Sequence, residues 1–295
     1  VNFYEIQEKD GKPVGSFFAD LYARPNKRGG AWMDECLVKV KLQGLNQKPV
    51  AHLVCNFNPP VGSDPSLLTH QEVTTLFHEF GHSLHHLLTE VDYPSLSGIN
   101  GVAWDAVELP SQFLENYAWL PEVLPWISSH YKTGEPLPAD KLEKLNASRT
   151  FLSGLSMARQ LEFALFDFRI HMEYDSSIGS QVEKIQTEVR DEISVLAPPS
   201  YNRFANSFSH IFGGGYAAGY YSYKWAEVLA ADAFSAFEEQ GNFDLDTAER
   251  FRRCILAVGG TRDALDAFVD FRSRPPSLEP LLRQSGIDSI GLTAT

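Results

Sequence analysis

The short pattern HEFGH at residues 78–82 constrains the fold of this chain more than any other feature of its sequence. Histidines at positions i and i+4 share one face of an α-helix, so His78 and His82 can bind the same ion only if the segment is helical. Residues 69–72 read THQE, a capping box that predicts where this helix begins. Apolar residues then recur at helical spacing from Leu76 to Leu87.

The predicted helix leaves little polar surface apart from the side that carries the histidines. Its apolar residues are Leu76, Phe77, Phe80, Leu84, Leu87 and Leu88. Burying two histidines and a glutamate among such residues costs free energy unless a cation or other partners satisfy them. The alternative, two histidines on a solvated helix face, fits these neighbours poorly. We therefore predict that His78 and His82 bind one Zn²⁺ ion.

The glutamate inside the pattern has a different predicted role. Glu79 lies about 100° round the helix from His78, beside the expected ion rather than on it. A bound zinc ion lowers the pKa of water towards ~7, and a neighbouring carboxylate can accept the proton that the water loses. Glu79 is therefore predicted to be the general base of a hydrolytic reaction.

A catalytic zinc site needs a third protein ligand, and the same helix does not supply it. His85 and His86 lie roughly 10.5 to 12 Å along the axis from His78, at about 1.5 Å per residue, which is too far to share one ion. A metzincin would have a third histidine six residues after His82, and that position is Leu88.

The third ligand is therefore expected on the next predicted helix, which carries Asp105, Glu108 and Glu115. Asp105 and Glu108 are three residues apart and share a face. A ligating histidine usually donates its second N–H to a carboxylate, a carbonyl or water, so one acid can bind zinc while the other orients a histidine. We assign Glu108 to the metal and Asp105 to a histidine, and the spacing alone also allows the reverse.

Residues 1–60 have the pattern of β-strands. Apolar and polar side chains alternate from Val38 to Gln43, as in a half-buried strand, and residues 15–24 and 49–57 are also extended runs. Residues 44–47 suit a hairpin turn between the last two strands. A small antiparallel β-sheet is predicted near the N-terminus.

After residue 60 the pattern becomes helical. Pro110 is expected to bend or restart the helix within residues 102–120. Further helical patterns cover residues 139–175, 181–196, 216–239 and 245–257. The prediction is a mainly α fold in which residues 1–295 form one helical, zincin-like catalytic domain, divided into a small sheet region (1–60) and a helical region (61–295).

Composition excludes several kinds of partner. The formal net charge is −13 at pH 7, which repels nucleic-acid phosphates and anionic lipid heads. No window of 18 residues is apolar throughout, so no transmembrane segment is expected. The three cysteines form no CxxC pair and fit reduced thiols in a cytoplasmic protein; they are Cys36, Cys55 and Cys254.

Residues 210–223 are rich in glycine and tyrosine. A glycine run before a helix can bind phosphate, but no strand precedes this one and no Lys-Ser/Thr follows, so a nucleotide site is not supported. Tyr216, Tyr220 and Tyr223 are spaced i, i+4 and i+7, as on one helix face. That spacing fits tyrosines packed in a core, and it equally fits phenols that donate to a developing oxyanion.

Three segments together carry a family resemblance: residues 77–85 (FHEFGHSLH), residues 105–115 (DAVELPSQFLE) and residues 209–216 (SHIFGGGY). With them, the chain resembles the thimet oligopeptidase family of zinc peptidases, in its oligopeptidase A branch. The resemblance implies a mostly helical, two-lobed fold with a deep channel that admits short peptides and excludes folded proteins. It also implies that Glu108 is the third zinc ligand.

The same resemblance implies roles for the glycine and tyrosine segment. Tyr223 would be the main oxyanion donor, with His210 and Tyr216 assisting. Tyr220 would line the site beside them. The glycines, of which Gly214 and Gly215 are the nearest to Tyr216, would let this segment flex over a bound substrate.

Family members are considerably longer, so this chain resembles their C-terminal catalytic part without the helical N-terminal region. The expected function is a zinc-dependent endopeptidase that acts on short, unfolded peptides, as a monomer normally joined to that region. Residues 36–57 could bind substrate backbone as an added strand. The alternative is a non-catalytic helical binding module, whose metal would be structural, held by four protein ligands, or absent.

Overall fold

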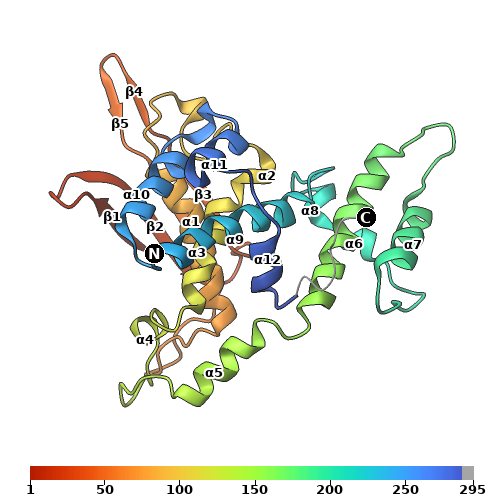
Figure 1. The fold of residues 1–295 in the computed structure, drawn as a ribbon, viewed down its shortest axis with the longest axis horizontal. Coiled ribbons are helices and arrows are strands. Elements are labelled where there is room, and N and C mark those ends of the chain that lie inside the picture. The colour runs from red at the N-terminus through yellow and green to blue at the C-terminus, as the bar shows by residue number, and fades with distance from the viewer. Residues whose placement is uncertain (288–295) are drawn as a thin grey trace.

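The computed structural model describes residues 1–287 (Figure 1). A mixed sheet forms from the N-terminal residues, in the strand order β1-β2-β6-β3. Its strands are β1 (Asn2–Gln7), β2 (Pro13–Tyr22), β3 (Trp32–Leu37) and β6 (Val50–Phe57). In Figure 1 this sheet lies on the opposite side of the molecule from the green helices α6 and α7.

Strand direction differs from the prediction in one pair. β1 pairs antiparallel with β2, and β3 pairs antiparallel with β6, but β2 and β6 run parallel, with Phe17 opposite Ala51. The prediction of an antiparallel sheet is wrong for this pair, because alternation shows which face a strand buries and not the direction of its neighbour. A parallel pair needs a long crossover. Residues 23–49 supply it, and they include β3.

The predicted hairpin between residues 38–43 and 49–57 is wrong, because β6 pairs with β2 and β3 instead. A separate two-stranded sheet joins β4 (Val40–Leu42) to β5 (Leu45–Gln47), with Leu42 opposite Leu45. The turn is therefore at residues 43–44, where Gly44 has a φ of +83°, and residues 45–47 belong to a strand. Two-residue hairpin turns favour glycine because they require positive φ.

The rest of the described chain is helical, which confirms the mainly α prediction. The α-helices that build the site and its supports are α1 (His70–Leu87), α2 (Trp104–Val107), α3 (Leu109–Glu115), α6 (Ser153–Met172), α8 (Ser209–Phe212) and α9 (Ser222–Gln240). The others are α4 (Leu124–Ile127), α5 (Ala139–Ser148), α7 (Val182–Ile193), α10 (Leu245–Phe251), α11 (Ala264–Arg272) and α12 (Glu279–Gln284). Short 3₁₀ turns are η1 (Pro94–Leu96), η2 (Asn116–Trp119), η3 (Phe204–Ser207) and η5 (Gly259–Thr261), and η4 (Arg252–Leu256) is a π-helical turn. None of the helices within residues 1–287 combines the length and the apolar character needed to cross a bilayer.

Local signals located several helix ends correctly. The capping box at the start of α1 is present: the Thr69 hydroxyl accepts from the Glu72 N–H at 3.2 Å, and Glu72 accepts from the Thr69 N–H at 2.7 Å. Pro110 lies in the first turn of α3, so the helix restarts there as predicted. The pattern at 139–175 is broken, because Leu152 has a φ of +55° between α5 and α6.

The two largest hydrophobic cores among the described residues are built from different sets of helices. The larger core joins α3, α9, α10 and α11, and at its centre Phe113 stacks on Phe251 with ring centroids 4.1 Å apart. The smaller core joins α6, α7 and α8 around Phe166 and Phe208. Helix α9 belongs to the larger core along most of its length, while Tyr220, just before it begins, packs in the smaller one.

Asp232 is a completely buried carboxylate on α9. Arg274 donates to its two oxygens at 2.5 and 2.6 Å, and the Ser277 N–H donates at 2.7 Å. Arg272 lies 3.3 Å away. Burial alone would raise the pKa of Asp232, but the hydrogen bonds from Arg274 and Ser277 outweigh it and lower this pKa below its usual 3.8.

Replacing Asp232 by asparagine should lower the free energy of unfolding by about 3 kcal/mol at neutral pH, because the arginines lose a buried counter-charge. Since the folded pKa is the lower one, this stabilisation is complete above the unfolded pKa and is lost as pH falls through the folded pKa. The difference between wild type and Asp232→Asn in urea unfolding should therefore shrink below about pH 4. A difference that stays constant in acid would contradict this assignment.

Candidate metal centre

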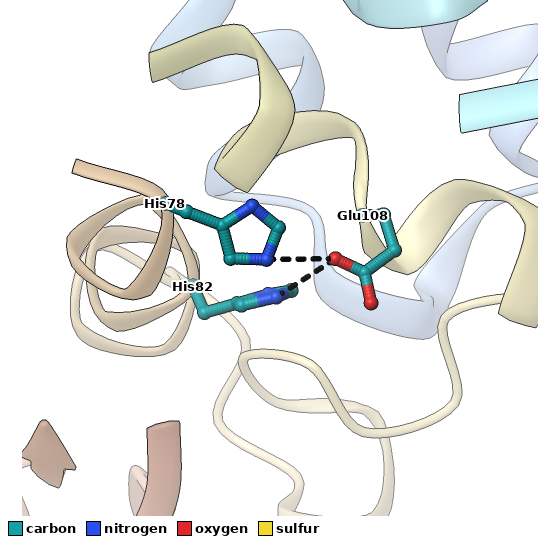
Figure 2. A group of neighbouring side chains, drawn as sticks. All are labelled: His78, His82 and Glu108. Atoms are coloured by element: carbon teal, nitrogen blue, oxygen red, sulfur yellow. Dashed lines mark ion pairs between the residues drawn. The ribbon is translucent and has the colours of Figure 1, made fainter. Parts of the chain in front are cut away.

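Two helices bring the three predicted ligands together. His78 and His82 project from α1, and Glu108 lies at the junction of α2 and α3 (Figure 2). The Nε2 atoms of the two histidines lie 3.2 and 3.0 Å from Glu108 Oε2. One donor atom from each residue lies within 4.8 Å of the other two, and no further His, Cys, Asp or Glu among residues 1–287 joins this group.

The close packing of α1 on α3 explains why Glu108 reaches the histidines. A Cβ atom on Gly81 would lie 2.5 Å from both the Pro110 carbonyl oxygen and Ser111 Cα, so any larger residue would separate the helices. Ser111 also orients the glutamate, since its hydroxyl donates to Glu108 Oε2 at 3.0 Å. The glycine within HEFGH therefore sets the distance between the helices that carry the three side chains.

The donor cluster is partly buried, and hydrogen bonds within it shift the pKa values of Glu108 and His78. Burial alone would raise the pKa of Glu108, which is 4% exposed, but hydrogen bonds from His78 and His82 hold it well below its usual range. Burial alone would lower the pKa of His78, and its hydrogen bonds to Glu108 and Glu115 instead raise it to about 10. Such a cluster needs positive charge at its centre, which a divalent cation can supply in place of protons.

The residue that orients a histidine is Glu115, and the assignment of Asp105 to that role is wrong. Glu115 Oε1 lies 2.6 Å from His78 Nδ1, whereas Asp105 accepts a hydrogen bond from the Tyr221 hydroxyl at 2.9 Å. The predicted spacing assumed one continuous helix, but α2 ends before Glu108 and α3 begins after it. Glu108 immediately precedes α3 and Glu115 is its last residue, about two helical turns later, so both carboxylates can face α1.

Glu79 occupies the position expected of a base. Its side chain lines the same cavity as the three donor residues, and it is only 5% exposed. Burial raises the pKa of the Glu79 carboxyl, while the nearby histidines and a hydrogen bond from the Met33 backbone N–H act in the opposite direction. A buried carboxyl with a raised pKa accepts a proton more readily than an exposed one does.

The histidines that follow in α1 are buried elsewhere. Both ring nitrogens of His85 lack a hydrogen-bond partner among the described residues, and burial lowers its pKa to about 3. His86 Nε2 lies 2.9 Å from the Leu37 carbonyl oxygen. Neither side chain joins the donor cluster, in agreement with the axial distance along the helix.

The donor cluster lies in a cavity of about 780 Å³ whose walls come from distant parts of the chain. Strand β3 contributes Trp32 and Met33, and the loop between η1 and α2 contributes residues 99–102. Arg28, which precedes β3 in the sequence, also lines the cavity. Its guanidinium group lies over the Trp32 ring, 5.5 Å from the ring centroid. Sequence patterns did not identify these residues, because β3 is short and its alternation is weak.

The tyrosine and histidine side chains predicted to donate to an oxyanion also line this cavity. Tyr216, Tyr223, His210 and Gly214 line the cavity. The Tyr216 hydroxyl donates to Glu108 Oε1 at 3.0 Å, and its ring stacks on Tyr223 with centroids 4.8 Å apart. Burial raises the pKa of Tyr223 to about 12, so its phenol is protonated and can donate at neutral pH.

Tyr220 and Gly215 are placed differently from the prediction. Tyr220 is 8% exposed in the smaller core, and its hydroxyl donates to Gln160 Oε1 at 3.0 Å. The shared helix face does not exist, because α9 begins only at Ser222. Gly215 has a φ of +86° and lies beside the Trp104 ring rather than in the cavity wall. The expected contacts of Tyr220 and Gly215 with a substrate are therefore not supported.

Comparison with known proteins gives a consistent family. The sequence profile of peptidase family M3 matches residues 1–287. Oligopeptidase A of Escherichia coli (strain K12) is 54% identical over 288 residues, which is 97% of this chain and 42% of that protein. The probable cytosolic oligopeptidase A of Arabidopsis thaliana is 49% identical over 296 residues, again 97% of this chain and 42% of its own length. The chain thus spans less than half of these relatives.

A solved structure shares the fold. Trypanosoma cruzi metallocarboxypeptidase 1 aligns with a TM-score of 0.59 at 12% identity, over 92% of this chain and 56% of that one. At this identity the likeness concerns the fold alone.

Replacing Gly81 by alanine should separate α3 from α1 and withdraw Glu108 from the histidines. We expect the free energy of unfolding to fall by about 1–3 kcal/mol, as for other overpacked sites, and zinc affinity measured by calorimetry to fall with it. Gly154→Ala in α6 is the matched control, because a Cβ there meets nothing within 4 Å. Equal zinc affinities for the two variants would show that the Gly81 contact does not place Glu108.

Proposed function

This chain belongs to peptidase family M3, and on that premise we propose that it is the zinc-bearing catalytic part of an endopeptidase that cleaves short, unfolded peptides. The observation that supports the proposal most directly is the convergence of His78, His82 and Glu108, with donor atoms within 4.8 Å of one another. Two imidazole nitrogens and a carboxylate oxygen are a donor set that suits zinc.

The number of donors favours a catalytic metal over a structural one. Structural zinc sites are usually closed by four protein ligands, whereas catalytic sites have three and keep a position for water or substrate. Among the described residues, three side chains form the group. A zinc ion held there would polarise a peptide carbonyl and make water more acidic. The competing proposal, a binding module with a structural metal, requires a fourth ligand.

In this proposal Glu79 moves the protons. Its carboxylate would accept a proton from the attacking water and deliver it to the leaving amine. Burial at the cavity wall and a raised pKa support this role, because the protonated and ionised forms of the carboxyl must both be accessible during one cycle.

Tyr223, His210 and Tyr216 would stabilise the oxyanion that develops on the scissile carbonyl. All three line the cavity that holds the donor cluster. The family resemblance makes Tyr223 the main donor in this proposal, and burial raises its pKa so that the phenol keeps its proton at neutral pH. Tyr216 already donates to Glu108 Oε1, so it can also orient that carboxylate.

The substrate backbone would bind along β3. This strand is at the edge of the sheet, so its outer backbone groups can pair with an added strand, apart from the Met33 N–H, which donates to Glu79. Trp32 and Met33 of β3 line the cavity, which places that edge beside the metal centre. The sequence assigned this role to residues 36–57, and the edge strand includes only the first two of them.

We propose residues 1–295 as one catalytic domain, the counterpart of the C-terminal catalytic part of longer relatives. The helical region that the family resemblance adds would complete a channel restricted to short peptides. The protein would act as a monomer in the cytoplasm, without nucleic acid or membrane partners, as its charge of −13 favours.

Replacing Glu79 by glutamine should lower kcat towards a fluorogenic peptide by about 10²–10⁴-fold, because a general base is lost. Zinc content should stay at the wild-type value. Glu143→Gln on the exposed face of α5 is the control and should leave both quantities unchanged. Near-normal activity of Glu79→Gln would rule out its role as base.

Chelation of the metal should abolish peptidase activity while the circular dichroism spectrum of the folded protein persists, whereas loss of the fold would favour a structural metal.

Replacing Glu115 by alanine should weaken zinc binding by about 10–100-fold, because His78 loses the partner that orients its ring. Asp105→Ala should have a much smaller effect, since Asp105 contacts Tyr221 and not a histidine. Competition with a chromogenic chelator measures both affinities. The opposite order would restore the assignment made from sequence spacing.

A further inference from the structure

Asp167 is a completely buried carboxylate that the proposed chemistry does not use. It lies on α6, in the smaller core, away from the zinc ligands. Its Oδ1 accepts a hydrogen bond from the Ala218 N–H, and its Oδ2 accepts one from the Tyr220 N–H, both at 2.9 Å. His171 Nδ1, one turn along α6, lies 3.0 Å from Oδ1. Two backbone amides of one segment therefore share the two oxygens of this carboxylate.

The segment that Asp167 contacts has little regular structure of its own. Between α8 and α9, residues 213–221 form turns, with Tyr216 N–H donating to the His210 carbonyl at 3.0 Å. Ala218 has a φ of +53°, a left-handed conformation that side chains with a Cβ rarely adopt. Such a conformation persists when the surroundings determine it. The Asp167 carboxylate, which accepts a hydrogen bond from the Ala218 N–H, holds this residue in that conformation.

The same segment connects Tyr216 and Tyr223, the two tyrosines that line the cavity of the metal centre. Tyr216 precedes Ala218 by two residues, and Tyr223 follows Tyr220 by three, in the first turn of α9. The opposite side of the segment is held by the metal-bearing half of the molecule, since Tyr221 donates to Asp105 at 2.9 Å and Gln112 donates to the Tyr223 carbonyl at 3.1 Å. On the side of the smaller core, Asp167 holds the backbone of the segment, while the Tyr220 side chain packs there and donates to Gln160.

We infer that Asp167 is a positioning residue for Tyr216 and Tyr223: it sets the backbone shape that aims their hydroxyls at the metal centre. The inference rests on the proposed function, in which these phenols stabilise the oxyanion. Because Asp167 touches neither substrate nor metal, its contribution should appear chiefly in the rate of the chemical step.

Asp167→Asn is the variant that tests this role, because asparagine keeps the size of the side chain but has one carbonyl oxygen. Its amide group would face one of the two backbone N–H donors, so one hydrogen bond is lost and the segment loosens. We expect kcat to fall by about 10-fold or more, since misplacement by 1 Å can cost 10²-fold. KM and zinc content should stay close to wild type.

Asp232→Asn is the matched control, since it alters the other completely buried aspartate whose partners are described above. Asp232 lies in the middle of α9. Its side chain contacts Arg272 and Arg274 and no residue of the 213–221 segment. This variant should lose stability without the decrease in kcat, measured well below its melting temperature. A similar decrease in both variants would assign the Asp167 effect to general destabilisation and overturn the inference.

A double-mutant cycle separates positioning from independent effects. If Asp167 acts through the phenols, the decrease in kcat caused by Asp167→Asn should shrink in a Tyr216→Phe or a Tyr223→Phe background. The same fold-loss in wild type and in both backgrounds would overturn the inference. If Tyr223→Phe and Tyr216→Phe both leave kcat unchanged, the oxyanion role in the proposed function fails instead.

Amide hydrogen exchange of residues 213–221 tests the structural cause without any measurement of activity. Asp167→Asn should accelerate exchange in this segment, whereas Asp232→Asn should not. Unchanged exchange in Asp167→Asn overturns the inference even if the wild-type chain shows no peptidase activity. Accelerated exchange with an inactive wild-type chain would support the Asp167 contact and count against the proposed function.

Discussion

The packing of α1 against α3 is the contact on which the rest of the structure depends. At Gly81 the two helices approach so closely that a single methyl group would overlap Pro110 and Ser111. Helix pairs with larger residues at the contact lie about 8–10 Å apart, and a side chain at this position would push the axes apart. Because Gly81 has no side chain, the Glu108 carboxylate, at the start of α3, comes within reach of the imidazoles on α1, and the cavity walls lie around that point.

The parts of the site that sequence reasoning located depend on geometry within one helix. His78 and His82 converge because positions i and i+4 always share a face, and the capping box at Thr69 is equally local. Glu115 was missed in favour of Asp105, because its role depends on where α2 ends. Neither spacing nor propensity indicates that a helix stops and restarts at Glu108, although Pro110 shows that some change occurs there.

The parts that could not be predicted depend on pairs of residues far apart in the chain. Strand β2 pairs with β6 in parallel across a crossover of residues 23–49, and no alternation pattern encodes the direction of a neighbour. The spacing predicts that Tyr220 shares a helix face with Tyr216, but the Tyr220 backbone N–H donates to Asp167 on α6, 53 residues away, and no helix forms there. A buried acid in an apolar helix such as α6 is the sequence signal that could have suggested such a bond.

Helix α9 enters the larger core at Leu229, and Tyr220, two residues before the helix begins, lies in the smaller core. Over its 19 residues it is about 28 Å long, at ~1.5 Å per residue. The two cores are thus joined by one stiff rod whose first turn forms part of the cleft. Any molecule that bridges Tyr223 and the cluster of His78, His82 and Glu108 adds a further link between the two cores, so its binding should make them melt as a single cooperative unit.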